Sequence, residues 1–178
     1  MFFLFLLCFL FHDKPSSLNS TPQAVQVRKG ISEAMAGWSK FHSEGSLFVL
    51  GHSVDARAAF GMLAGGNVWF SVMGGCFPKP CMEILEAAKE FKESASGDDA
   101  AKAKAKAKCL ALNTHLQPVW DCMLQFGSLR VAYAMVNLCN MCPTEVSMPR
   151  PLLNLKGDQL QQVQDALVSA GLLGEASK

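Results

Sequence analysis

A lysine at the end of a short predicted strand is the residue of this sequence that could most readily take part in a chemical reaction. Lys29 follows Val25-Gln26-Val27-Arg28 and precedes Gly30, so we expect it at the carboxyl end of a strand, next to a turn. A buried lysine can lose its proton by desolvation, and its amine can then attack the carbonyl carbon of a ketone. Taken alone, the pattern is more typical of a lysine that faces solvent at a strand end.

The seven cysteines have neither the density nor the spacing of a disulfide framework. They indicate reduced thiols in an intracellular setting, with sulfur atoms that pack as small hydrophobic groups. Cys139 and Cys142 form a Cys-x-x-Cys pair, but no second pair or close histidine completes a zinc site. His115 is interpreted as a surface or capping residue rather than a ligand. No metal or other cofactor is predicted.

Length and composition are those of one folded domain with a substantial core. The 178 residues are 50% hydrophobic and 17% charged, which excludes a largely disordered chain. A complete (β/α)8 barrel needs roughly 250 residues, which is more than this sequence contains. The formal net charge of +1 argues against a dedicated nucleic-acid-binding protein.

The first residues form an apolar run whose role stays open. Residues 2–11 are uncharged, too short for an ordinary membrane span, and similar to the core of a signal peptide. No basic residue precedes them, and no small-x-small cleavage site follows closely. The run is therefore either a targeting segment or a cryptic start that replaces the true amino-terminal half. We do not expect membrane association, and we favour a cytoplasmic over a secreted protein, with an organelle also open.

Strands and helices alternate between residues 24 and 93. Hydrophobic patterns predict strands at 24–29, 47–50 and 68–72, and helices at 32–42, 54–64 and 78–93. Gly51-His52-Ser53 is expected to stop the second strand, and Met73-Gly74-Gly75 to leave the third. Successive strand–helix units favour parallel strands with right-handed crossovers, and hence the α/β class.

The remainder of the sequence has only helical periodicity. Alternating Ala and Lys at 101–108 predict a solvated helix, because a period of two scatters the lysines around the helix axis. Two amphipathic helices are predicted at 116–126 and 129–139, separated by Gly127. Asp158 with Gln161 resembles a capping box at the start of a last helix.

The run Ser71-Val72-Met73-Gly74-Gly75-Cys76-Phe77-Pro78 resembles the end of the eighth barrel strand in the dihydrodipicolinate synthase and N-acetylneuraminate lyase family. That strand typically ends in Ser-Val-x-Ala/Gly-Asn-x-x-Pro. Other segments resemble the family in the same order, from residue 24 to residue 173. Residues 25–29 resemble the sixth strand, 48–51 the seventh, and 62–66 the turn before the eighth. Gly97-Asp98, Asn113 and Pro118 resemble the helical extension, and 148–155 resemble the proline-rich link to the last helix.

The resemblance implies part of a (β/α)8 TIM barrel, containing equivalents of strands 6 to 8 and followed by an α-helical extension. The domains would be an apolar leader and linker at 1–23, a partial β/α barrel at 24–93, and the helical extension at 94–178. Three strands cannot close a barrel, so the expected assembly is a homo-oligomer or a complex with a complementing chain.

The resemblance also implies a class I aldolase, a lyase that needs no cofactor. In this chemistry a lysine amine condenses with the keto group of pyruvate or another 2-keto acid, and the iminium acts as an electron sink while a carbon–carbon bond forms or breaks. Lys29 would be the nucleophile, and the backbone carbonyl of Phe70 would face the keto acid. Gly51, Ser71 and Gly74 would line the mouth of the site, at the carboxyl ends of the strands.

Departures from the family pattern limit what the resemblance implies. Gly30-Ile31-Ser32-Glu33-Ala34 follows the lysine in place of an acidic residue and Ser-Ser/Thr-Gly-Asp, and Gly75 replaces the asparagine of the eighth strand. A sugar-acid or hydroxyproline-type aldolase or dehydratase therefore fits as well as an enzyme of lysine biosynthesis.

The family's Gly-Thr-Thr turn and its proton-relaying tyrosine come from strands that precede the lysine. The only tyrosine here is Tyr133, in the helical extension. We therefore expect a truncated family member with little or no activity of its own. The alternative is a non-catalytic half-barrel or helical interaction module.

Overall fold

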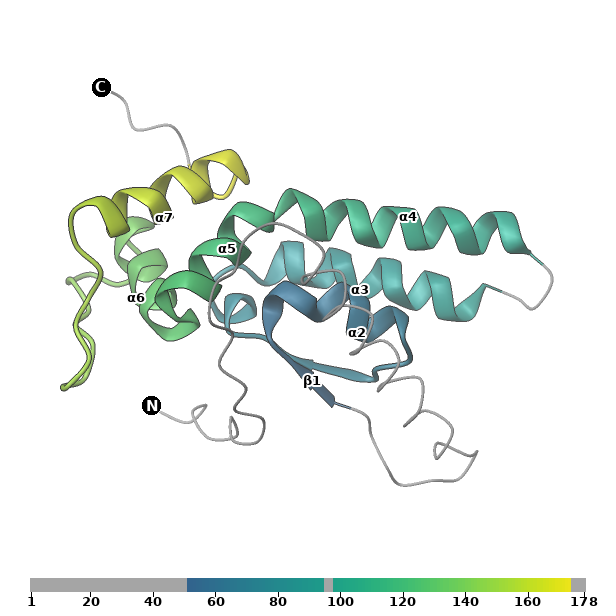
Figure 1. Cartoon of the computed structure of the whole chain (residues 1–178), viewed down its shortest axis with the longest axis horizontal. Helices are drawn as coiled ribbons and strands as arrows, with labels where there is room; N and C mark the ends of the chain where they lie inside the picture. Colours follow the sequence, from purple (N-terminus) through teal and green to yellow (C-terminus); the bar gives the residue numbers. More distant parts are fainter. Residues whose placement is uncertain (1–50, 95–97, 174–178) are drawn as a thin grey trace.

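The structure is a computed structural model that describes residues 51–94 and 98–173. Several predicted features lie outside these residues: Lys29 and the segments 24–29, 32–42 and 47–50. Within the described part the fold is mixed, with two short parallel strands and a larger set of helices (Figure 1).

The two strands pair in parallel over three residues each. β1 (Gly51–Ser53) lies beside β2 (Val68–Phe70), with His52 opposite Trp69. The prediction that Gly51-His52-Ser53 stops a strand is wrong, because these residues pair with β2. β2 is shorter than predicted, because the backbone N–H of Val72 donates to a side chain, Asp55, rather than to a neighbouring strand.

A short crossover joins the strands. The helix predicted at 54–64 is divided into a 3-10 turn, η1 (Asp55–Arg57), and α2 (Ala58–Leu63). The physical reason is Val54, whose φ of 77° is incompatible with a helix. Helices α2 and α3 lie on one side of the strand pair (Figure 1).

The longest helices form an antiparallel pair. A second 3-10 turn, η2 (Met73–Gly75), leads into α3 (Pro78–Glu93), where the predicted helix forms with proline in its first turn. α4 (Asp99–His115) begins at Asp98, whose side chain accepts a hydrogen bond from the Ala101 N–H at 2.9 Å.

α4 contains the solvated helical segment predicted at 101–108. Its buried residues Ala105, Cys109 and Asn113 recur every four positions and form one face, while the four lysines of this helix are exposed. Lys108 forms an ion pair with Glu90 of α3 at 2.9 Å. Position in the helix, rather than alternation of residue type, therefore decides which side of α4 is buried.

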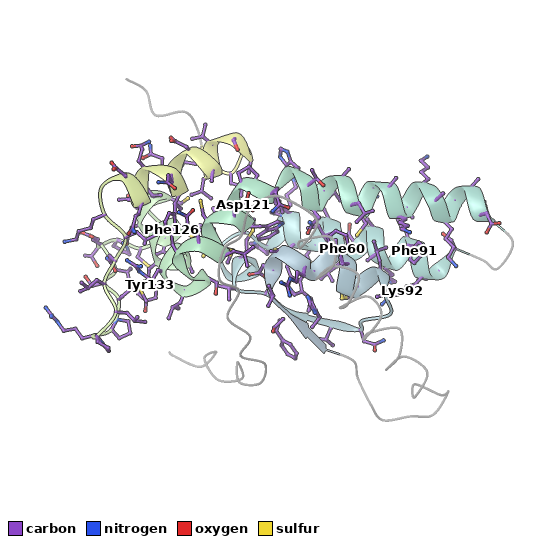
Figure 2. The ribbon with its side chains drawn as sticks, in the orientation of Figure 1. Phe60, Phe91, Lys92, Asp121, Phe126 and Tyr133 are labelled. Carbon is purple, nitrogen blue, oxygen red and sulfur yellow. The ribbon has the colours of Figure 1, made fainter. Side chains whose placement is uncertain are left out.

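Two further side-chain contacts lie near the carboxyl end of α3, one with the turn before β2 and one with α4. The Lys92 ammonium donates a hydrogen bond to the carbonyl of Gly66, in the turn between α2 and β2. Figure 2 labels Lys92 and Phe91 on α3. The Lys102 ammonium of α4 lies 5.3 Å from the centre of the Phe91 ring, which is within the range of a cation–π contact.

Three further helices complete the described chain. α5 (Gln117–Phe126) and α6 (Ser128–Leu138) meet at Gly127, whose φ of 88° favours glycine, so the predicted break is confirmed. α7 (Asp158–Ser169) lies against both of these helices.

The predicted capping box of α7 is wrong. Gly157 occupies the N-cap position, and Asp158 is the first residue of the helix. Gln161 instead donates a hydrogen bond to Asp165, one turn further on, at 2.8 Å. The sequence spacing fits a capping box, but the positive φ of Gly157 starts the helix one residue earlier than the pattern suggests.

A continuous hydrophobic core connects α2 with the later helices. Trp120 is fully buried at its centre, and its indole N–H donates to the carbonyl of Asn113 at 3.1 Å. Other residues of the same core come from several elements: Met73, Ile84, Leu116, Val131, Met135, Val163 and Leu167. No helix of the described residues is both long enough and apolar enough to cross a membrane.

Candidate functional site

The carboxyl ends of β1 and β2 lie at one edge of the strand pair, and a buried carboxylate connects them. Asp55, only 5% exposed, follows β1 by two residues. Its Oδ1 accepts a hydrogen bond from the indole N–H of Trp69 at 3.0 Å, and its Oδ2 accepts the backbone N–H groups of Val72 and Met73 at 3.1 and 3.2 Å. Asp55 thus connects the segment that follows β1 with the segment that follows β2, and these two segments are the strand exits.

The protonation of Asp55 is set by opposing effects. Burial raises its pKa above the usual value, while hydrogen bonds from the Ser71 hydroxyl, the backbone and Trp69 oppose that shift. Since both carboxylate oxygens are already engaged, this group is suited to holding the turn after β2 in place. It is not arranged to exchange protons with a ligand.

Ser71 and Gly74, two residues predicted to line the site, are brought together in that turn. The Ser71 hydroxyl accepts the backbone N–H of Gly74 at 2.8 Å and lies 3.7 Å from the Cys81 sulfur. A Cβ added at Gly74 would lie 3.2 Å from both Cβ and Oγ of Ser71. The hydroxyl is therefore part of the local hydrogen bonding that shapes the turn.

Gly51 and Phe70, also predicted site residues, meet on one face of the strand pair. Because side chains alternate along a strand, Gly51 and Ser53 share a face with Val68 and Phe70. A Cβ added at Gly51 would lie 2.7 Å from Cε2 of Phe70, so the ring covers the space that a side chain would need. Phe70 is 62% exposed, and no described element covers this face.

The opposite face of the strands packs against helices. The His52 ring lies against Gly61 of α2, where an added Cβ would be 2.8 Å from the imidazole. Its Nε2 is buried without a hydrogen-bond partner. Burial lowers the pKa of His52, which favours the neutral imidazole. His52 thus belongs to the packing of α2 rather than to the strand exits.

The backbone between β1 and Asp55 is strained. Val54 has a φ of 77° and a ψ of 93°, a conformation that a β-branched residue rarely adopts. Strain of this kind costs on the order of 1–3 kcal/mol and persists only where surrounding interactions impose it. Here the hydrogen bonds of the adjacent Asp55 are the interactions that hold the chain in this path.

The described cysteines form no disulfide with one another, and they differ in exposure. Burial raises the pKa of Cys81 and of Cys109 to about 11, which leaves little thiolate at neutral pH. Cys142, in contrast, is exposed. Among residues 51–94 and 98–173, no group of three or more His, Cys, Asp or Glu side chains could hold a metal ion.

The structure therefore places the predicted residues in two pairs. Ser71 and Gly74 shape the turn after β2, and Gly51 and Phe70 contact each other on the uncovered face of the strands. Lys29 lies outside the described residues. Asp55 was not among the predicted site residues, although an acidic residue in the stretch that follows the apolar segment 47–50 is a signal that could have identified it.

Comparison with solved structures shows a similarity to an enzyme of known structure. The structure is similar to a crystal structure of a dihydrodipicolinate synthase from Agrobacterium tumefaciens, with a TM-score of 0.59 and 30% sequence identity. The match covers 76% of this chain but only 41% of the synthase. No protein-family model matches the sequence, and no curated protein matches it.

Proposed function

We propose that this chain provides the part of a (β/α)8 barrel equivalent to strands 6 to 8 and its helical extension, in a lyase that acts on pyruvate or another 2-keto acid. The similarity to a dihydrodipicolinate synthase, at 30% identity over 76% of the chain, is the observation that carries the proposal. The parallel pairing of β1 and β2 through α2 supports it, because a barrel repeats this unit.

In the proposed reaction the amine of Lys29 attacks the keto carbon of the substrate. Loss of water leaves an iminium ion, which becomes an enamine when it accepts the electron pair of a neighbouring carbon–carbon bond that breaks, or of a carbon–hydrogen bond that loses its proton. The enamine carbon then takes up a proton, or attacks the carbonyl carbon of a second substrate, and the iminium forms again. Water attacks this iminium carbon and restores the lysine and the ketone. No cofactor takes part in these steps.

The described residues support this proposal by their position. Ser71 and Gly74 lie just beyond the carboxyl end of β2, and active sites of barrel enzymes lie at this end of the strands. In a closed barrel the face that carries Gly51 and Phe70 would point inward, because the opposite face is covered by α2. Asp55 would act as a positioning residue that fixes the turn at the mouth.

We further propose that the isolated chain turns over substrate weakly or not at all. The only tyrosine of the sequence, Tyr133, belongs to α6, and Figure 2 places it far along the helical part from β1. The proton relay and the groups that bind the substrate carboxylate would come from residues outside these 178.

Borohydride trapping with pyruvate tests the proposed nucleophile. Borohydride transfers hydride to the iminium carbon and converts the Schiff base into a stable secondary amine. Peptide mapping of the full 178-residue chain should place the adduct on Lys29, and Lys29→Arg should abolish it. Lys104→Arg, at an exposed position of α4, is the matched control and should leave the adduct unchanged.

Two outcomes would contradict these proposals separately. The aldolase proposal is wrong if Lys29 is not labelled, or if labelling is spread equally over the exposed lysines. If Lys29 is labelled and the isolated chain also turns over a 2-keto acid substrate, the aldolase chemistry stands and the proposal of inactivity is wrong.

The uncovered face of the strands favours a second candidate function, that of a non-catalytic half-barrel that pairs with another chain. Phe70 and Val68 of this face are 62% and 36% exposed, although apolar side chains of this kind are usually covered. Light scattering after size-exclusion chromatography should show a dimer or larger species. A monodisperse monomer that is not labelled by pyruvate would exclude both the half-barrel and the aldolase.

A further inference from the structure

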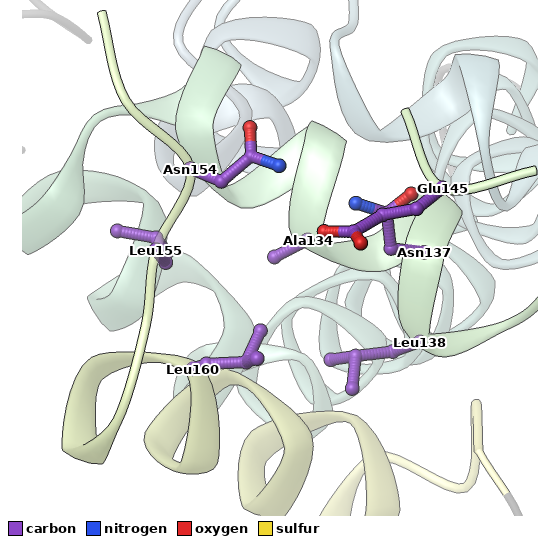
Figure 3. Close-up of a pocket in the computed structure, with 7 residues that line it drawn as sticks. All are labelled: Ala134, Asn137, Leu138, Glu145, Asn154, Leu155 and Leu160. Carbon is purple, nitrogen blue, oxygen red and sulfur yellow. The ribbon is translucent and has the colours of Figure 1, made fainter. Parts of the chain in front are cut away.

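A second candidate site lies in the helical part of the molecule, formed by α6, α7 and the segment between them. Here the structure contains an open pocket with a volume of about 290 Å³ (Figure 3). It is lined by four aliphatic and three polar side chains: Ala134, Leu138, Leu155, Leu160, Asn137, Glu145 and Asn154. Ligand pockets typically begin at about 300 Å³, so this one suits a small molecule.

Two asparagines give the pocket a fixed shape. Asn137 of α6 forms two hydrogen bonds with the backbone of Val146, donating to its carbonyl at 2.9 Å and accepting its N–H at 2.8 Å. Asn154 donates to the same carbonyl at 3.0 Å and accepts the N–H of Met148 at 2.8 Å. The segment after α6 is therefore held at three backbone groups, and the pocket exists before any ligand binds.

The floor of the pocket is apolar. Ala134 and Leu155 are 4% and 3% exposed and belong to the hydrophobic core. Leu138 and Leu160 are partly buried and pack against that core from α6 and α7. A ligand that covers these side chains would remove apolar surface from water, which favours an aliphatic body.

Glu145 supplies the only acidic group of the pocket lining, and its carboxylate is available. Figure 3 shows the carboxylate projecting over the pocket toward Ala134. No residue of the described chain forms an ion pair or hydrogen bond with it, and the lining contains no lysine or arginine. The amides of Asn137 and Asn154 already hold backbone groups, so the carboxylate dominates the electrostatics of the pocket.

We propose that this pocket binds a primary aliphatic ammonium ion of about four carbon atoms. The ammonium group would donate to Glu145, and the hydrocarbon chain would cover Leu138 and Leu160. Charge-assisted hydrogen bonds of this kind are stronger than neutral ones, and the aliphatic floor adds affinity that grows with chain length. This site is distant in sequence from the strand exits and does not depend on the proposed lyase reaction.

Titration of the full chain with n-butylammonium tests the proposal, with the side-chain amide signals of Asn137 and Asn154 followed by NMR. We expect saturable shifts of both signals with a dissociation constant on the order of millimolar, as suits a ligand of so few atoms. Glu145→Gln should weaken binding roughly five- to tenfold. Glu86→Gln, at an exposed position of α3 that forms no ion pair with another described residue, should bind as the wild type does.

Two further ligands separate the contributions of charge and chain. Pentanoate has a similar hydrocarbon chain with a negative head group, and it should not bind. Methylammonium retains the charge without the chain, and it should bind more weakly than n-butylammonium. The proposal is overturned if the two amide signals do not shift, if Glu145→Gln binds n-butylammonium with unchanged affinity, or if pentanoate binds equally well.

Discussion

Two carboxylates of this protein differ in burial and in hydrogen bonding. Asp55, at the strand exits, is 5% exposed and accepts hydrogen bonds on both oxygens from an indole and two backbone N–H groups. Glu145, at the pocket between α6 and α7, is exposed and has no such partner among the described residues. A carboxylate whose acceptors are all occupied shapes the fold, whereas one without partners remains available for a ligand.

In both regions, side chains form hydrogen bonds with backbone groups. At the strand exits a side chain binds consecutive N–H groups after β2, and at the pocket two asparagine side chains bind Val146 and Met148. In both places a side chain supplies hydrogen bonds where regular secondary structure ends. The two regions differ because, among the described residues, the pocket has a carboxylate without a partner, Glu145, beside an apolar floor, whereas the carboxylate of Asp55 is fully engaged.

Replacing each carboxylate by alanine gives the largest predicted contrast. Asp55→Ala should lower the free energy of unfolding by about 3 kcal/mol, because the buried N–H of Met73 and the partly buried indole N–H of Trp69 lose their acceptors. Glu145→Ala should change it by no more than about 0.5 kcal/mol, as is usual for an exposed side chain. Urea denaturation measures both, and equal losses for the two variants would contradict the comparison.

Asn137→Ala tests whether the pocket depends on its own side-chain hydrogen bonds. We expect a loss of about 2 kcal/mol in unfolding free energy, because the donor and the acceptor of Val146 both lose this partner. The affinity for n-butylammonium should fall with it, since the pocket wall is no longer fixed. Unchanged stability together with unchanged affinity would show that other contacts hold the segment.

Gly51→Ala tests the close contact on the uncovered face of the strands. The new methyl group would meet the Phe70 ring, and because that ring is 62% exposed it can rotate away at a cost of about 1 kcal/mol. Phe70→Ala should remove this cost, so the double variant should be more stable than the sum of the single effects predicts. Strict additivity would mean that the ring does not limit residue 51.

Protonation of His52 is expected to make the stability of the fold depend on pH. Burial, with a smaller contribution from Arg57, lowers the pKa of His52 from 6.5, while a hydrogen bond with Val54 and the charge of Asp55 oppose the shift. The neutral imidazole thus adds stability above about pH 6.5, and this contribution is lost as the pH falls toward the folded-state pKa.

Thermal unfolding between about pH 7 and pH 5 measures this effect. His52→Phe keeps a flat ring against Gly61 but cannot take up a proton, so its melting temperature should fall less steeply than that of the wild type. The same slope in both proteins would show that His52 does not contribute to the acid sensitivity.

Local features of the sequence were sufficient to predict most of the helical structure. The prolines before α3 and the apolar spacing within it predict a helix from 78 to 93, which is the helix observed. Gly127 likewise predicts the break between α5 and α6, because both signals depend on backbone preferences of a few adjacent residues. The prediction of a capping box also relied on a few adjacent residues, but it was wrong, because the sequence does not reveal the positive φ of Gly157.

The tertiary structure decided how the candidate site is arranged. Asp55 reaches the N–H groups of Val72 and Met73 only because β1 and β2 pair in parallel, which brings residues 17 and 18 positions apart into contact. The same pairing places Gly51 under Phe70 and leaves that face uncovered among the described residues. Residue type could suggest a chemical role for each position, but only the long-range hydrogen bonds of Asp55 show that this carboxylate connects the segments after the two strands. Likewise, only the folded structure shows that no described residue pairs with Glu145.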